Sequence, residues 1–232
     1  MGTYTIRKTM GRTILLNGKH TPLGSQLTRL FLEDGDKIAG LVEGSLSEPL
    51  PGEEAEENLT IIPWNRSSPI SVHNVLVETI NRIDHIDEAV FLFQPEIENK
   101  PLHELSLAAI DSYIDTYLKG SLFLLKEVLG YFQKQKKGAL YIVLDYSGLE
   151  VLPPIDAIGI GGMEAFTDTL FILYQNEQVA IHGFSSSTAE KPEYAAFIHR
   201  TITEKARGSH GKWYRFNERS VWNALGFSSK NR

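Results

Sequence analysis

Two aspartates near the middle of the chain are the first candidates for chemistry. Asp145 follows an apolar run at residues 139–144, and Asp156 follows Pro153-Pro154. Two carboxylates at one site can act as a general acid and base, or can hold a hard cation. Asp145 can equally well end a strand while Asp156 caps the helix that begins after the prolines, and this second interpretation is favoured because helix caps are common.

A second candidate for chemistry lies nearer the N-terminus. Gly18 and Gly24 flank a turn between the apolar run 13–17 and an amphipathic stretch that opens at Gly24. Glycines in such a turn let backbone N–H groups approach a phosphate at the N-terminus of a helix. Glu43 follows about 20 residues later, where an acid can hold a ribose hydroxyl. Pro22 has no N–H, so these residues could also form a plain strand-to-helix turn.

Composition narrows the classes of function. The 232 residues carry a net charge of −6, which argues against binding nucleic acid or an anionic membrane over the whole surface. Cysteine is absent, so disulfides and thiolate sites are excluded, and the seven histidines lack the spacing of metal ligands. We therefore expect no metal site. No apolar run approaches ~18 residues and the N-terminus does not resemble a secretory signal, so we expect a cytoplasmic protein.

Short apolar runs alternate with stretches of helical periodicity along the chain. This alternation is typical of parallel strands joined by crossover helices, which cover both faces of a sheet. It predicts one α/β domain over residues 1–232, a three-layer α/β/α fold with a mostly parallel sheet and tails at 1–11 and 217–232. The predicted strands are 13–17, 37–42, 59–62, 89–93, 139–144, 179–182 and 213–216, and the predicted helices are 24–34, 71–86, 106–134 and 163–174.

From Arg12 to Phe216 the order of elements resembles the short-chain dehydrogenase/reductase family of NAD(P)-dependent oxidoreductases, which have a Rossmann-type fold. Several of the family's landmarks can be matched. Its TGxxxGxG loop falls on residues 17–24, its Asp-Val pair on Asn65-Arg66, its P-L-x-E-L-S on 101–106 and its V-D-V-N-L-K-G on 114–120.

This resemblance implies a dinucleotide site at the carboxyl ends of the strands. NAD or NADP is the implied cofactor, and Glu43 after the second strand slightly favours NAD. Lys19 and His20 could add positive charge near a phosphate. The implied contacts with the cofactor come from Gly18, Lys19, His20, Leu23, Gly24, Glu43, Asn65, Arg66 and Phe93.

The chain departs from the family at each catalytic position. The family's Asn, Ser, Tyr and Lys are matched by Tyr117, Asp145, Asp156 and Ile160. Hydride transfer to a carbonyl needs a proton donor at the oxygen, which in the family is a phenol tuned by a nearby ammonium. An aspartate is ionised at neutral pH unless burial raises its pKa, and isoleucine carries no charge. The family's Pro-Gly after the sixth strand is replaced by Ser185-Ser186.

We therefore expect a degenerate member of the family without ordinary dehydrogenase activity, which binds a dinucleotide or another small ligand in the former cleft. Two alternatives remain open. One is an NAD(P)-dependent oxidoreductase of altered mechanism using Asp145, Asp156 or Tyr117, and the other is a non-catalytic interaction subunit. The resemblance also implies a homodimer or homotetramer, for which the apolar surface would come from Leu122, Phe123, Leu124, Leu170, Phe171 and Leu173.

A final asymmetry concerns the C-terminal end. Residues 200–232 hold eight Lys and Arg but two Glu, interleaved with Trp213, Tyr214, Phe216 and Trp222. We interpret this basic stretch as a solvated tail or an oligomer contact, and we expect no nucleic-acid partner and no membrane partner.

Overall fold

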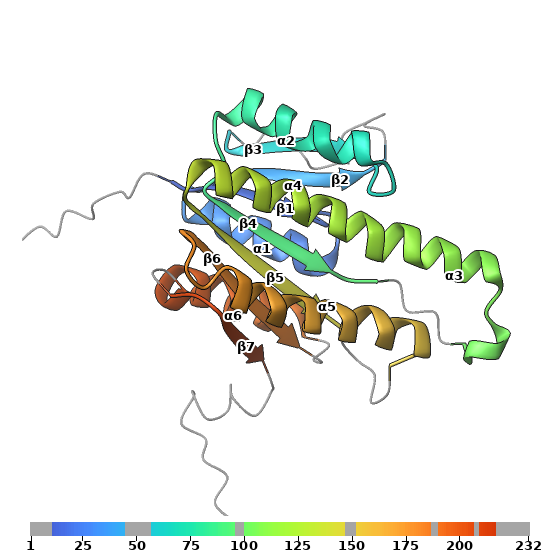
Figure 1. The fold of residues 1–232 in the computed structure, drawn as a ribbon. Helices are drawn as coiled ribbons and strands as arrows, with labels where there is room; N and C mark the ends of the chain where they lie inside the picture. Colours follow the sequence, from blue (N-terminus) through green and yellow to red (C-terminus); the bar gives the residue numbers. More distant parts are fainter. Residues whose placement is uncertain are drawn as a thin grey trace, which may run out of the picture.

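A single parallel sheet organises the part of the chain that the computed structural model describes, namely residues 11–44, 57–95, 100–146, 152–186, 190–206 and 209–216 (Figure 1). Within these ranges seven strands follow the order β3-β2-β1-β4-β5-β6-β7, and every neighbouring pair is parallel. The strands are β1 Thr13–Asn17, β2 Lys37–Glu43, β3 Leu59–Trp64, β4 Glu88–Phe93, β5 Gly138–Asp145, β6 Val179–Ser186 and β7 Lys212–Phe216.

Helices cover both faces of this sheet. On one face α1 (Pro22–Glu33) packs beside α6 (Lys191–Thr201) over a core that includes Phe31, Phe184 and Ile198. On the other face α2 (Pro69–Ile83), α4 (Gly120–Gln135) and α5 (Pro154–Leu173) enclose a second core. The predicted three-layer α/β/α fold with a parallel sheet is confirmed.

The strand predictions were accurate because the five inner strands are largely buried apolar runs, while β3 and β7 at the edges are only partly buried. All seven predicted strands are present, and most extend by one to four residues beyond the predicted bounds. Pro63 lies in β3, which is an edge strand of the sheet, where the missing backbone N–H breaks no ladder. The predicted division into one domain with two tails stays a prediction, since residues 1–10 and 217–232, including Trp222, lie outside the described ranges.

The long predicted helix 106–134 is interrupted. It comprises α3 (Leu107–Tyr113), a π-helical segment η2 (Ile114–Lys119) and α4. At the junction a Cβ on Gly120 would lie 2.9 Å from the Arg66 carbonyl oxygen, so a glycine permits the close approach of the two backbones. π-helical turns are frequent at functional sites. Two other short helical segments are η1 (Leu102–Glu104), which precedes α3, and η3 (Ile202–Ala206), which follows the helix at Lys191–Thr201.

Two further helix predictions need correction. The helix predicted at 163–174 begins at Pro154, because proline is favourable in the first helical turn. Helix α6, between the sixth and seventh strands, was not predicted at all. Both corrections matter for function, since each of these helices begins at the carboxyl edge of the sheet.

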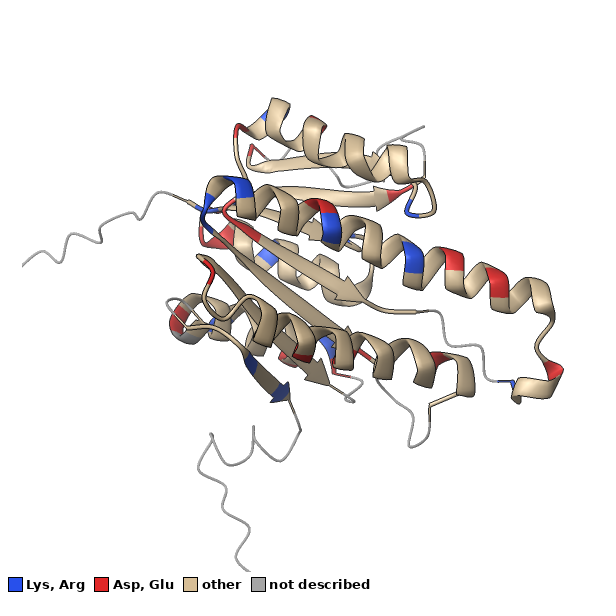
Figure 2. Cartoon of the chain, viewed as in Figure 1, with Lys and Arg blue, Asp and Glu red and all other residues tan. Residues whose placement is uncertain are grey.

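Charges of both signs are interspersed along α3, η2 and α4 (Figure 2). At the opposite, amino-terminal edge Arg12 joins three strands: its Nε donates to the two carboxylate oxygens of Asp36 at 3.1 and 3.0 Å, and its Nη1 donates to Glu88 at 3.2 Å.

Among the described residues, no helix combines the length and apolar character that crossing a membrane would require.

Candidate functional site

The carboxyl ends of the parallel strands bring the predicted site residues to one edge of the sheet. Asn17 ends β1, Glu43 ends β2, Phe93 ends β4 and Asp145 ends β5. In a sheet of this topology, ligands bind in the crevice at this edge, near the point where strand order reverses between β1 and β4. The predicted residues therefore lie along a single crevice, in three neighbouring groups.

The first group is the turn from β1 into α1. Gly18 has a φ of +67°, and its carbonyl oxygen accepts from the Thr21 amide and hydroxyl at 2.9 and 2.8 Å. Thr21 is the N-cap of α1, and its hydroxyl oxygen accepts from the Gly24 amide at 3.1 Å. A Cβ on Gly24 would lie 2.0 Å from the Gly18 carbonyl oxygen, so only glycine lets the helix approach this closely.

This turn leaves the positive end of the α1 dipole facing the crevice, with Leu23 between Pro22 and Gly24. Lys19 is buried, and its stem packs on β2, where a Cβ on Gly40 would lie 3.1 Å from Lys19 Cγ. The pKa of His20 is lowered, first by partial burial and second by the charge of Lys19, so His20 adds little positive charge at neutral pH.

The second group joins the ends of β2 and β3. Arg66 Nε lies 2.7 Å from Glu43 Oε2 and forms an ion pair with it. The direction of the Nε–H bond does not meet the geometry of a hydrogen bond. The guanidinium carbon also lies 5.7 Å from the Trp64 ring centroid and 5.5 Å from that of Tyr117. Asn65 closes the turn by accepting from an amide two residues on at 2.9 Å. Glu43, predicted to hold a ribose hydroxyl, is thus already engaged by Arg66.

The third group lies where the Tyr113 side chain, at the end of α3, contacts α5 at Gly159. Tyr113 is the last residue of α3, and Tyr117 lies one turn later in η2. Their ring centroids are 5.1 Å apart. The Tyr113 hydroxyl lies against Gly159, where a Cβ would be only 2.1 Å away, and beside the fully buried Asp156. Burial first, and the charge of Asp156 second, raise the pKa of Tyr113 far above its ordinary value. Phe93 closes the same corner, 3.3 Å from the Gly159 Cβ position.

A cation at this edge comes from α6, the helix that the sequence analysis missed. Lys191 Nζ lies 2.6 and 2.7 Å from the two carboxylate oxygens of Asp145, and Gln94 Nε2 donates to the same carboxylate at 2.6 Å. The Asp145 side chain is 2% exposed and that of Lys191 is 20% exposed, so this is a largely buried ion pair. The signal was present in the sequence: Pro192 stands at the first turn, and Tyr194, Ile198 and Ile202 recur every four residues.

The two predicted aspartates therefore have different partners. Asp145 ends β5 as predicted and pairs with Lys191, whereas Asp156 lies beside Tyr113. The prediction that Asp156 caps its helix is wrong, because Pro153 is the N-cap and Asp156 points inward from the first turn. In the described part of the chain, no group of three or more His, Cys, Asp or Glu side chains is arranged to hold a metal.

The remaining predicted positions are buried. Ile160, matched with the family's lysine, is 4% exposed in the core beneath α5. Ser185 and Ser186 end β6 and are also buried, while Ser187 lies outside the described residues. Tyr117 is half-buried between Arg66 and Tyr113. The edge is thus spanned by a continuous row of side chains, which runs through Glu43, Arg66, Tyr117, Tyr113 and Asp156.

Comparisons with known proteins agree with this architecture. No protein-family model matches the chain. An uncharacterised oxidoreductase of Staphylococcus haemolyticus is 24% identical over 144 residues, which span 61% of this chain and 61% of that relative. A 3-ketoacyl-(acyl-carrier-protein) reductase from Brucella melitensis, complexed with NADH, superposes with a TM-score of 0.77 at 10% identity, over 88% of this chain and 96% of the reductase.

A short-chain type dehydrogenase/reductase from Mycobacterium marinum superposes with a TM-score of 0.78 at 13% identity, over 96% of this chain and 98% of that one. An NADH-dependent reductase complexed with NAD gives 0.75 at 14% identity, over 89% and 95% of the two chains. The chain shares the fold of these reductases. At these identities the likeness establishes the fold, and activity must be argued from the residues.

Proposed function

We propose that the chain is a divergent member of the short-chain dehydrogenase/reductase family, which binds a nicotinamide dinucleotide at the carboxyl edge of its sheet without carrying out the ordinary dehydrogenase reaction. The fold supports the first half of this proposal, since two of the structural neighbours are complexes with NADH or NAD. The sequence relative, itself described as an oxidoreductase, points the same way.

The residues of the first two groups fit a dinucleotide. The tight Gly18–Gly24 turn and the N-terminus of α1 suit a pyrophosphate, with Leu23 supplying a backbone N–H that Pro22 cannot. Glu43 and Asn65, at and just after the ends of β2 and β3, would contact the adenosine half, and Arg66 would have to share Glu43 with the ribose. When bound, the nicotinamide would donate or accept a hydride. NAD is slightly favoured over NADP because Glu43 repels a ribose phosphate.

One observation carries the proposed loss of ordinary activity: Asp156, at the position matched with the family's tyrosine, is buried beside the phenol of Tyr113. An ammonium beside a tyrosine lowers its pKa and makes it a ready proton donor and acceptor. For Tyr113 the effect is the opposite, because burial first and the charge of Asp156 second raise its pKa. Ile160, at the position matched with the family's lysine, is packed in the core and supplies no charge.

Thermal unfolding with NAD, NADH, NADP and NADPH tests the binding half of the proposal. A ligand at 100 times its dissociation constant stabilises the folded chain by ~2.7 kcal/mol. We expect stabilisation by NAD or NADH and no consumption of NADH with a panel of aldehydes and ketones. Stabilisation by none of the four dinucleotides, or steady turnover of any carbonyl, would refute the proposal.

The Asp145–Lys191 pair favours a second candidate, an oxidoreductase of altered mechanism. The Lys191 ammonium is held at the catalytic edge by two short contacts and could protonate a carbonyl oxygen as hydride arrives. In that case wild-type chain would turn over a carbonyl substrate, and Lys191→Met would lower kcat sharply while NADH binding is retained. Inertness of the wild-type chain would exclude this candidate.

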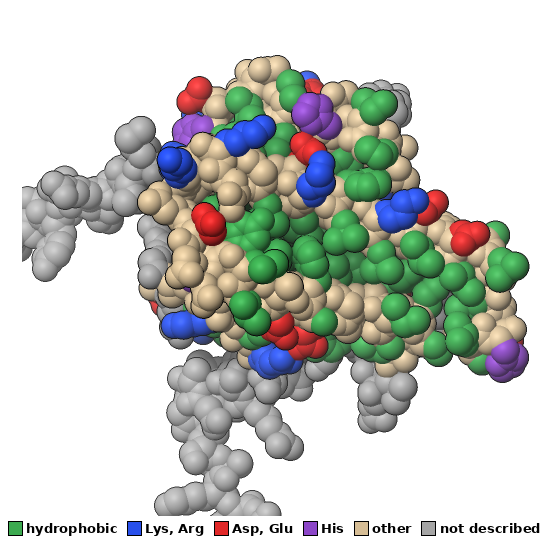
Figure 3. Space-filling model, viewed as in Figure 1, with side chains coloured by type: hydrophobic (Ala, Val, Ile, Leu, Met, Phe, Trp, Pro, Cys, Tyr) green, Lys and Arg blue, Asp and Glu red, His purple; other side chains and the backbone are tan. Residues whose placement is uncertain are grey.

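We also propose that the chain forms a homodimer or homotetramer through α4 and α5. Apolar side chains gather along these two helices (Figure 3). Leu122, Ile158, Ile172 and Leu173 are 44%, 62%, 67% and 67% exposed, which is unusual for large apolar residues on neighbouring helices. Leu124 and Leu170, also predicted for this surface, are instead buried in the core of the chain itself.

A further inference from the structure

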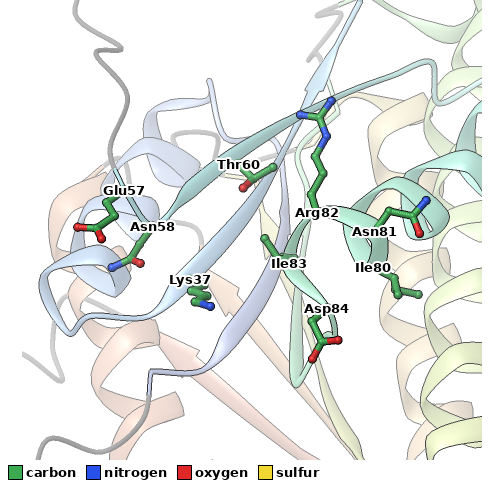
Figure 4. Close-up of a pocket in the computed structure, with 9 residues that line it drawn as sticks. All are labelled: Lys37, Glu57, Asn58, Thr60, Ile80, Asn81, Arg82, Ile83 and Asp84. Carbon is green, nitrogen blue, oxygen red and sulfur yellow. The ribbon is translucent and has the colours of Figure 1, made fainter.

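A polar groove lies at the opposite edge of the sheet from the candidate site (Figure 4). It has a volume of about 420 Å³ and lies between the start of β2, the start of β3 and the end of α2. This volume falls within the range of small-molecule sites. The residues that line it are Lys37, Glu57, Asn58, Thr60, Ile80, Asn81, Arg82, Ile83 and Asp84.

The C-terminus of α2 presents backbone carbonyl groups to this groove. In a continuing helix, the carbonyls of Asn81 and Arg82 would accept from the amides of His85 and Ile86. The chain turns away at Asp84, so the His85 amide donates to the Ile83 carbonyl at 3.0 Å and the Ile86 amide to the Tyr131 hydroxyl at 3.1 Å. The end of α2 therefore carries partial negative charge that favours a cationic group.

The turn that creates this arrangement is strained. Asp84 has φ +78° and ψ −50°, and it closes a γ-turn through the bond from His85 to Ile83. A non-glycine residue in such a conformation costs about 1–3 kcal/mol and persists where something else requires it. Here an aspartate, rather than the glycine common after a helix, lines the rim of the groove, and its exposed carboxylate also lies 3.2 Å from His85 Nδ1.

The facing wall carries Lys37 and Glu57, and Figure 4 shows the Glu57 carboxylate directed away from α2. Lys37 opens β2 with an exposed side chain, and within the described ranges no carboxylate lies at ion-pair distance from its ammonium. Figure 4 shows that Arg82 extends away from Asp84 along β3, where it donates to the Ile61 carbonyl and to Glu78. Lys37 is therefore the cation left for an anionic group. Asn58 and Thr60 add neutral polar groups beside it.

We propose that this groove binds a small zwitterionic metabolite of the α-amino-acid type. The ligand's carboxylate pairs with Lys37, and its ammonium lies against Asp84 and the last carbonyls of α2. A group of one charge would satisfy one wall and leave the other unmatched, so the groove selects a dipolar molecule. This site is separate from the proposed dinucleotide site, and neither proposal depends on the other.

Titration of the ¹⁵N-labelled full-length chain with L-glutamine tests the proposal. We expect saturable shifts of amide signals confined to residues 57–60 and 80–85. Acetate and methylammonium, which each carry half of the zwitterion, should bind at least tenfold more weakly. Absence of saturable, localised shifts would overturn the proposal, as would acetate binding as tightly as glutamine.

Variants assign the two charges. Lys37→Met and Asp84→Asn should each weaken glutamine binding about tenfold or more, which corresponds to about 1.4 kcal/mol. Asparagine also tolerates a positive φ, so the second variant should fold as well as the wild type. Lys134→Met removes an exposed ammonium from α4 and serves as the matched control, with unchanged affinity. Equal affinity in Lys37→Met and wild type would contradict the proposed orientation.

Discussion

Alanine at position 159 should destabilise the fold, although alanine is ordinarily the better helix former. Gly159 lies inside α5, and a Cβ there would be 2.1 Å from the Tyr113 hydroxyl oxygen. Tyr113 is 7% exposed, so the ring has no open space into which to move. Alanine gains ~1 kcal/mol of helix propensity over glycine, while overpacking costs ~1–3 kcal/mol. We expect a net loss of about 1 kcal/mol in the free energy of unfolding.

The same helix supplies matched controls. Gly161 and Gly162 are exposed, and a Cβ at either position meets nothing within 4 Å. Alanine at these positions should stabilise the chain by up to ~1 kcal/mol. Urea unfolding at constant protein concentration measures all three variants. If Gly159→Ala is as stable as Gly161→Ala, the placement of Tyr113 against α5 is wrong.

A double-mutant cycle then identifies the contact. Tyr113→Phe removes the hydroxyl, and the nearest remaining atom, the ring Cζ, is 3.1 Å from the Cβ position. In this background Gly159→Ala should be nearly neutral, which gives a coupling energy of about 1 kcal/mol. Tyr113→Phe alone should also cost about 1–3 kcal/mol, because buried Asp156 loses the adjacent hydroxyl. Additive effects of the two substitutions would refute the contact.

Three further variants test other parts of the account. Lys191→Met should destabilise the chain by roughly 3 kcal/mol, because the Asp145 side chain is 2% exposed and loses its cation; adding Asp145→Asn should recover most of this loss in urea unfolding. Burial lowers the pKa of His182 below its ordinary 6.5, so the unfolded chain takes up a proton at higher pH than the folded one; stability should fall as pH drops below about 6.5, and this fall should be smaller in His182→Gln but unchanged in His103→Gln. Leu173→Glu should shift the oligomer toward monomer in light scattering, and an unchanged mass would argue against the α4–α5 interface.

The fold was largely predictable because its inner strands are continuous, largely buried apolar runs. Such runs are visible without knowledge of their neighbours, and parallel strands must place their carboxyl ends at one edge. The Gly18–Gly24 turn was predictable because the contacts that form it lie between residues close together in the sequence. The π-helical segment was not, and it ends at Gly120, where the chain approaches Arg66, which lies 54 positions away.

The partners of the candidate site residues could not be predicted from local patterns. Asp145 meets Lys191 across 46 positions, and its partner lies on a helix whose polar outer face weakened the apolar pattern. Asp156 was interpreted as a cap because aspartate commonly caps helices, yet tertiary packing turns it inward toward Tyr113. Each charge at the edge is defined by a distant partner, which the spacing of residues along the chain does not reveal.

The nicotinamide fluorescence of NADH, followed over time in the presence of the chain and a carbonyl panel, tests the central claim most directly. The account predicts a saturable rise as NADH binds, followed by a constant signal. A rise that decays with any carbonyl would show ordinary turnover, and the absence of a rise would show that the carboxyl edge does not bind the dinucleotide. Either result would contradict a protein that binds the dinucleotide and whose Tyr113 phenol is held beside the Asp156 carboxylate.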